Sequence, residues 1–494
     1  MTPETSTSIA PPSYEPPRMA AEERRVEDKS ASLKKELGLR DLVLQQIMFV
    51  MGTTWVGTAA KLGHSQMVFW LAAMLFFYLP QAAVVIDLTK RMPLEGGLYQ
   101  WARITLGEMV AFLVAWNLWI FAVTLIATIG LLMATNLSYA IGPSAGWMAS
   151  NKPFIMLLNV LLLCGLMAVA AVGLGVAKWV HNVGSVMMLS AFGVLIVLPF
   201  VHMARGTLPI HGAYAVTMPA LSLLSVNIFG KLAVGALSGF EYVAVLAGET
   251  KNPERTIGRA TMIAAPVIGV LFILGTNAVL AFVPMNDINL IGPIPQVLQI
   301  GFGSSGVGVA VSAIAILLIT ARSIANSSVV FTGSTRMPMV AGWDNLLPSW
   351  FTKLHPRFRT PVNSILFVGL VALVFGGAAI AGVGEQEAYQ LLDNAAGIFY
   401  GLTYLVLFAI PLIGLRGAAS KPALWLRIAS ASGFAVTLLY VVLSIFPIID
   451  VASWWSFALK ISGVVVGFNL VGVLLYWNAK RRRGVLLPAG GYGH

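Results

Sequence analysis

Twelve long apolar runs divide this sequence of 494 residues, and they constrain its fold more than any other feature. A helix needs about 20 mostly apolar residues to cross the hydrocarbon core of a bilayer. Because lipid offers no partner for backbone polar groups, runs of this length indicate helices. The sequence therefore predicts an all-α integral membrane protein with twelve transmembrane helices. The runs lie at 41–62, 66–88, 104–140, 153–176, 179–203, 221–249, 258–284, 306–336, 361–382, 388–415, 423–448 and 453–478.

The distribution of Lys and Arg supports this count and predicts the orientation. With both termini in the cytoplasm, 25 of the 31 Lys and Arg residues fall on inner segments, as the positive-inside rule requires. The net charge of +11 is therefore a topology signal, and we expect no nucleic-acid partner. The predicted location is the cell (inner) membrane. The other six cations are Lys61, Lys152, Arg205 and Lys460 outside, with Lys231 and Arg322 inside the membrane.

Composition excludes several other classes of protein. With 58% hydrophobic and 10% charged residues, the chain could not cover a soluble globule with polar surface. Segments 1–40 and 481–494 are polar, and we expect two cytoplasmic tails, the first largely disordered. The one cysteine, Cys164, has no His or Cys cluster near it, so neither a metal site nor a cofactor is expected. The sequence offers no nucleophile–base pair or phosphate loop, which argues against an enzyme.

Glycine pairs interrupt the first and the sixth apolar runs. Residues 51–57 read MGTTWVG, and residues 235–241 read GALSGFE. Glycine and hydroxyl residues lower the cost of unwinding a helix, and interrupted segments at matching positions of two halves point to the binding site of a transporter. The same residues suit close packing of small helix faces. The residue pattern alone therefore leaves both interpretations open.

Further motifs carry a resemblance to a known family. Residues 93–101 read PLEGGLYQW, residues 248–255 read GETKNPER, and residues 344–348 read DNLLP. These three motifs follow the glycine break at 51–54, in the order typical of the amino acid–polyamine–organocation superfamily of permeases. The sequence resembles that superfamily over most of its length. The resemblance implies alternating access on a leucine-transporter-like fold with a 5+5 inverted repeat. The repeats would occupy 41–203 and 221–415, and the last two spans 423–480.

The resemblance also implies that an amino acid binds between the two breaks. The amides of Gly52, Thr53 and Thr54 would receive its carboxylate, since a half-helix N-terminus is partly positive. Carbonyls near Val50, Gly235 and Ser238 would receive its ammonium group. Arginine exchangers of the family carry a polar amide where this chain has Ala122, so a neutral amino acid is favoured over a polyamine or other organic amine. The remaining expected substrate contacts are Trp55, Gly239, Phe240 and Val330.

The coupling mechanism stays open at this stage. A carboxylate in the middle of a span is costly and usually functional, so we predict that Glu241 is a coupling or gating group; capping of unwound amides is the alternative. Ser327 and Ser328 could contribute oxygen ligands to a sodium site. Proton-coupled relatives often carry a lysine in span five, where this chain has Met188. Exchange or proton coupling is favoured over sodium coupling. A channel is the alternative from another class of protein, although channels favour repeated pore rings.

Besides Glu241, the charged residues Arg322, Asp393 and Lys231 lie within the apolar runs. We predict a buried ion pair between Arg322 of span eight and Asp393 of span ten, because isolated charges in a bilayer are costly. Its expected role is a structural strut. Lys231, at the start of span six, is expected to snorkel outward and receives no functional role.

Overall fold

The described part of the chain is helical, with one isolated bridge between Leu37 and Thr250. This confirms the predicted all-α class. The bridge places the segment before the first span against the start of the seventh, and the N–H of Lys251 also donates to the carbonyl of Leu37 at 3.0 Å. The computed structural model describes residues 37–92, 97–172, 177–210, 214–240, 250–303, 306–343, 347–356, 360–381, 383–414 and 422–486.

Ten helices in the described residues are long and apolar enough to cross a membrane. Each coincides with one of the predicted runs, because the length of an apolar run fixes the length of the helix that can bury it. In chain order they are α4–η2–α5 (Gly63–Arg91 with η1), α7–α8 (Glu108–Ile141), α10 (Lys152–Val172), α11 (Ala177–Ala204), α14 (Pro253–Phe282), α16 (Val307–Trp343), α17 (Val362–Ile380), α18 (Glu385–Ile413), α19 (Leu424–Leu443) and α20 (Trp454–Leu486).

The other two predicted spans, the first and the sixth, are interrupted. The first consists of α2 (Leu39–Val50) and α3 (Trp55–Ala60), with residues 51–54 outside either helix. The sixth consists of α12 (Leu223–Gly230) and the π-helix η4 (Lys231–Ala236), after which residues 238 and 239 leave the helix. Both interruptions lie where the glycine pairs predicted them.

Three short segments connect the spans. The helix α6 (Leu98–Leu106) precedes span three and meets α7 (Glu108–Ala127) at Gly107, which has φ +103°. The segment after span seven contains the helix α15 (Pro293–Phe302). In the described residues that follow α16, the chain forms the 3₁₀ turn η7 (Ser349–Thr352). Prolines 348 and 356 flank that turn, and proline opposes a continuing helix.

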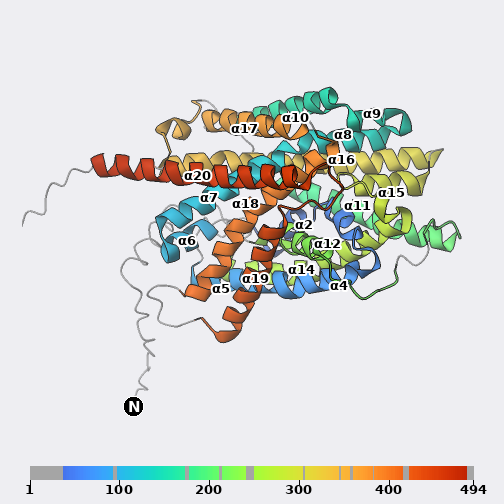
Figure 1. Cartoon of the computed structure of the whole chain (residues 1–494), viewed down its shortest axis with the longest axis horizontal. Coiled ribbons are helices and arrows are strands. Elements are labelled where there is room, and N and C mark those ends of the chain that lie inside the picture. The colour runs from blue at the N-terminus through green and yellow to red at the C-terminus, as the bar shows by residue number, and fades with distance from the viewer. Residues whose placement is uncertain are drawn as a thin grey trace, which may run out of the picture.

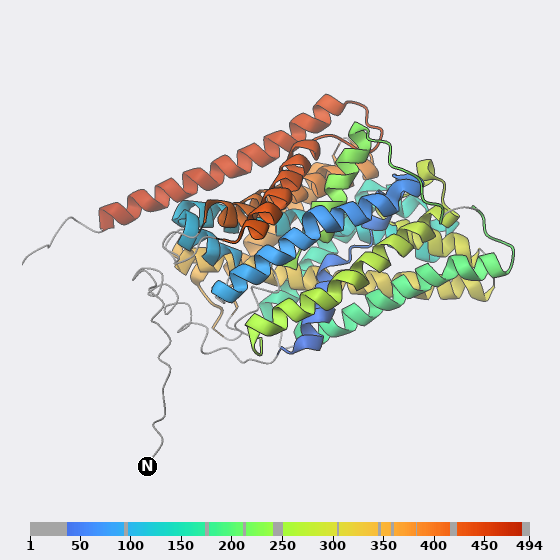
Figure 2. The ribbon, with the colours of Figure 1, turned by 90° about the horizontal axis from the view of Figure 1, so that it is seen from below.

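The two interrupted spans lie inside the bundle, among the uninterrupted ones. Val50, Val56 and Ala236 belong to the largest buried apolar cluster, together with Phe272 of α14 and Tyr404 of α18. By contrast, α20 lies along the edge of the bundle and extends beyond it (Figure 1). Seen from below, α5, α14 and α11 run side by side along the long axis (Figure 2). The breaks are therefore surrounded by protein, where unpaired backbone groups are tolerated.

Polar side chains fix the register of neighbouring helices. Gln46 of α2 donates to Thr261 of α14 at 2.9 Å, and such interhelical bonds help to hold membrane helices together.

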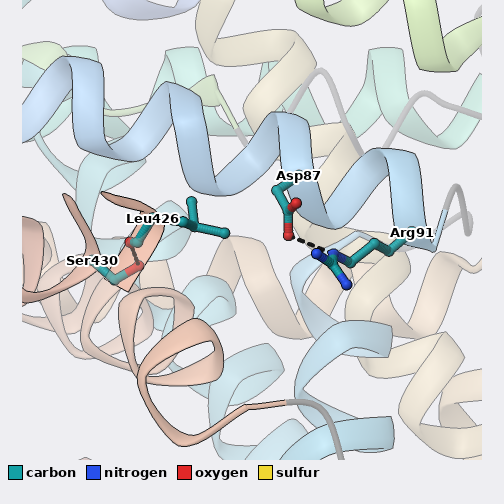
Figure 3. Close-up of polar contacts among 4 residues, drawn as sticks. All are labelled: Asp87, Arg91, Leu426 and Ser430. Carbon is teal, nitrogen blue, oxygen red and sulfur yellow. Dashed lines mark hydrogen bonds and ion pairs between the residues drawn. The ribbon is translucent and has the colours of Figure 1, made fainter. Parts of the chain in front are cut away.

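Other polar side chains bond within their own helix. At the predicted inner end of span two, Arg91 pairs with Asp87 one turn earlier, with 2.8 Å between Nε and Oδ2 (Figure 3). In the neighbouring α19, the hydroxyl of Ser430 donates to the carbonyl of Leu426 within its own helix (Figure 3), as serine commonly does in apolar helices.

Candidate transport site

The indole of Trp55 fills the space between the two breaks. A Cβ added at Gly52 would lie 2.5 Å from Cδ1 of Trp55, and one added at Gly235 would lie 2.4 Å from its Cη2. One edge of the ring therefore rests on the first break and the other on the sixth span. Glycine is required at both positions because any side chain would overlap the ring.

The first break leaves backbone amides available. The N–H of Gly52 donates to the carbonyl of Val50 at 2.9 Å, so this predicted carboxylate ligand is already engaged. Within the described chain, no hydrogen bond engages the N–H of Thr53 or Thr54. Helix α3 begins directly afterwards, because the carbonyl of Thr54 accepts from Gly57 and Thr58 at 3.1 and 3.2 Å. Two of the three predicted amides thus stand at the start of a half-helix.

Side chains from spans two and ten satisfy the break in the sixth span. Gly239 adopts φ +126°, a conformation that favours glycine, and its N–H donates to the hydroxyl of Tyr404 at 2.9 Å. With its amide oriented to match its neighbours, Gln81 accepts from that hydroxyl at 2.9 Å and from the N–H of Phe240 at 3.2 Å, and donates to the carbonyl of Leu237 at 3.2 Å. This network satisfies the backbone groups of the unwound segment at Leu237, Gly239 and Phe240.

The predicted substrate ligands of span six differ in whether other protein groups already contact them. The hydroxyl of Ser238 donates back to the carbonyl of Val234 in η4. The ring of Phe240 packs edge-on against Tyr78, with 4.6 Å between ring centroids, and is buried. Gly235 faces Trp55 directly. Of these three, only Gly235 lies against the space between the breaks.

Lys231 is buried, contrary to the expectation that it snorkels outward. Its side chain is 1% exposed, and its Nζ donates to Oδ1 of Asn394 in α18. The carboxylate of Asp393 acts electrostatically on this ammonium group, and also on the hydroxyl groups of Tyr389 and Tyr440. A polar cluster therefore links the first part of span six to span ten.

Arg322 has a different partner from the one the sequence predicted. Its Nη2 donates to the carbonyls of Met48 at 2.8 Å and Met51 at 3.2 Å, and the side chain is 5% exposed. The predicted ion pair between Arg322 and Asp393 is not formed among the described residues, because Asp393 faces Lys231 instead. The end of α2 attracts the guanidinium group, since the last carbonyls of a helix lack partners and carry partial negative charge.

The remaining predicted residues are only partly brought to the breaks. Thr54 interacts through its side chain with the hydroxyl of Tyr389. Ala122 is buried on α7, and Val330 packs against a second apolar cluster around Trp119 and Phe399. Ser327 and Ser328 are half-buried and make no hydrogen bond within the described chain. Glu241 lies outside the described residues, as do the motif segments 93–96, 241–249 and 344–346.

Gln81, Tyr404 and Lys231 were not predicted as site residues, although two of them left a signal in the sequence. Gln81 is a polar side chain in the middle of the apolar run 66–88, and Lys231 is a cation several residues inside the run 221–249. Polar residues in a span usually face protein or a cavity. Tyr404 gives no such signal, because tyrosine is common in apolar helices.

Comparisons with known proteins agree with this geometry. A family model described as amino acid permease matches residues 42–468. The methylthioribose transporter of Bacillus subtilis is 26% identical over 75% of this chain and 82% of its own length. The branched-chain amino acid permease BcaP of the same organism is 24% identical over 74% of this chain and 80% of its own length. The crystal structure of MhsT in complex with L-phenylalanine is similar with a TM-score of 0.59 at 12% identity, covering 83% of this chain and 98% of that one. This similarity confirms the predicted leucine-transporter-like fold.

Proposed function

The chain belongs to the amino acid permease family and is a multi-pass membrane transporter, and from this premise we propose that it carries neutral amino acids by alternating access. The transport mode is exchange or proton-coupled symport. Its location is the cell membrane, with both termini in the cytoplasm. The observation that carries the proposal is the meeting of two interrupted spans at the indole of Trp55, between Gly52 and Gly235.

The space between the breaks suits the two charges of an amino acid backbone. The free N–H groups of Thr53 and Thr54 begin α3, where a carboxylate is stabilised by the amides and the helix dipole. The carbonyl of Val50, at the end of α2, already accepts from Gly52 and could accept from an ammonium group with its second lone pair. In broken-helix transporters the substrate site is built in this way.

A neutral side chain fits the surroundings better than a basic one. Ala122 is buried, Phe121 stacks on Tyr400 with 4.2 Å between ring centroids, and Val330 contacts the apolar cluster. Asp393 of α18 is an acid that could attract a second amine, and Lys231 already balances its charge. A polyamine would have to displace that lysine from the carboxylate.

Substrate binding requires Trp55 to move. Its indole occupies the space between the breaks in this conformation, so rotation of the side chain would open the site. The conformation described is therefore assigned to the transporter without substrate, and the amino acid would bind to the state in which the ring has left Gly235.

A substrate screen followed by counterflow tests the proposal. Purified protein is heated with leucine, phenylalanine, alanine, arginine, putrescine or methylthioribose, because a ligand stabilises the state that binds it. We expect the largest thermal shift with a neutral amino acid. Proteoliposomes preloaded with that amino acid should then accumulate its labelled form. A shift with putrescine alone would support the amine alternative, and flux that neither saturates nor responds to preloading would support a channel.

A further inference from the structure

The break in span one leaves backbone carbonyls at the end of α2, and Arg322 lies beside them. Helix α2 ends at Val50, and the amide of Gly52, which would normally bond to the carbonyl of Met48, donates to Val50 instead. The carbonyl of Met51 lies beyond the helix end. The break thus leaves two carbonyl oxygens without helical partners, at a helix end that carries partial negative charge.

The guanidinium group of Arg322 satisfies both oxygens from the middle of span eight. One nitrogen, Nη2, lies 2.8 Å from the carbonyl oxygen of Met48 and 3.2 Å from that of Met51. Span five lies beside the arginine stem, since a Cβ added at Gly184 would be 3.9 Å from Cγ of Arg322, at van der Waals contact. Spans one, five and eight therefore meet at one buried positive charge.

Carbonyls at half-helix ends are the groups with which broken-helix transporters coordinate coupling ions. A free ion at such a place enters and leaves in each transport cycle, which allows its gradient to drive the substrate. A guanidinium group is covalently tethered and stays protonated in proteins. It can neither leave with the substrate nor release a proton.

We infer that Arg322 is a built-in cation that replaces a coupling ion at the break in span one, so that no sodium or proton gradient drives transport through this site. The inference rests on the proposed transport function and narrows its mechanism. Ser327 and Ser328, the predicted sodium ligands, lie more than one turn further along α16. They are therefore not part of a sodium site with the carbonyls that Arg322 holds.

Three substitutions separate the charge of Arg322 from its hydrogen bonds. Arg322→Lys keeps a cation, and Arg322→Gln keeps an N–H donor without charge. Arg322→Ala leaves the carbonyls of Met48 and Met51 without this hydrogen-bond donor. Arg205→Ala, at an exposed turn, is the matched control. We expect the affinity for the amino acid to fall about tenfold or more in Arg322→Gln, since a charge-assisted bond is lost, and to fall less in Arg322→Lys.

Chemical rescue provides a readout that needs no substrate. The melting temperature of Arg322→Ala should rise saturably with millimolar guanidinium chloride, relative to choline chloride, whereas Arg205→Ala and the wild type should not respond. If Arg322→Gln binds and melts as the wild type does, or if guanidinium does not stabilise Arg322→Ala, the inference is overturned. A wild type that requires sodium for counterflow would also overturn it. Failure of the wild type to transport any amino acid would instead refute the proposed function and leave the rescue test decisive.

Discussion

Replacing Gly235 by alanine should destabilise this conformation, because the indole of Trp55 lies between Gly235 and Gly52 and would have to give up that position. The new Cβ would lie 2.4 Å from Cη2 and 3.0 Å from Cζ2 and Cζ3 of the indole. Moving the ring away by the missing ångström would press its other edge onto Gly52, where a Cβ would already be 2.5 Å away. Overpacking of a closely packed site costs about 1–3 kcal/mol, and we expect a loss in the free energy of unfolding within that range.

Gly193→Ala is the matched control for this substitution. Gly193 lies in the transmembrane helix α11, and an added Cβ there would meet no atom within 4 Å. Alanine in a helix interior is more favourable than glycine by up to about 1 kcal/mol, so this variant should be as stable as the wild type or more so. Unfolding in mixed micelles measures both variants.

A double-mutant cycle attributes the loss to the tryptophan. In a Trp55→Leu background the overlap with Gly235 disappears, so Gly235→Ala should cost close to nothing there. The coupling energy between the two positions should therefore be about 1–3 kcal/mol. If Gly235→Ala is as stable as Gly193→Ala, or costs the same with leucine at position 55, the indole is not held between the two breaks and the reasoning is refuted.

Four further substitutions test other parts of the account. Lys231→Met should cost about 3–5 kcal/mol of stability by leaving the carboxylate of Asp393 uncompensated. Adding Asp393→Asn should recover most of that loss in the same unfolding assay. A double variant no more stable than Lys231→Met alone would contradict the pairing. Tyr404→Phe removes the acceptor of the Gly239 N–H and should cost about 0.6–1.7 kcal/mol, with equal stability counting against the network. Glu241→Gln should flatten the pH dependence of uptake into proteoliposomes if Glu241 couples protons, and an unaltered pH profile would remove that role.

The fold could be predicted from the sequence because lipid imposes simple demands. The length of each apolar run sets the helix that can cover it, and residues 51–54 leave the helix where paired glycines made unwinding inexpensive.

The partners of buried charges could not be predicted, because depth along a helix does not specify its rotation. Arg322 and Asp393 both lie within predicted spans, yet the former faces the end of α2 and the latter faces span six. The orphan carbonyls of Met48 and Met51 are backbone groups, which no residue pattern displays. Lys231 was misjudged for a related reason, since snorkelling was weighed without the amide of Asn394 opposite it.

Protection of a cysteine at position 53 by substrate tests most directly whether an amino acid binds between the breaks. Thr53→Cys keeps the backbone N–H that we assign to the carboxylate, and replacing the single native cysteine, Cys164, by alanine leaves one reactive thiol. The account predicts that the amino acid transported in counterflow slows thiol labelling at position 53, with half-maximal protection near its transport affinity, and that a non-transported amino acid has no effect. Labelling at an unchanged rate with the transported amino acid at saturation would contradict binding at this site.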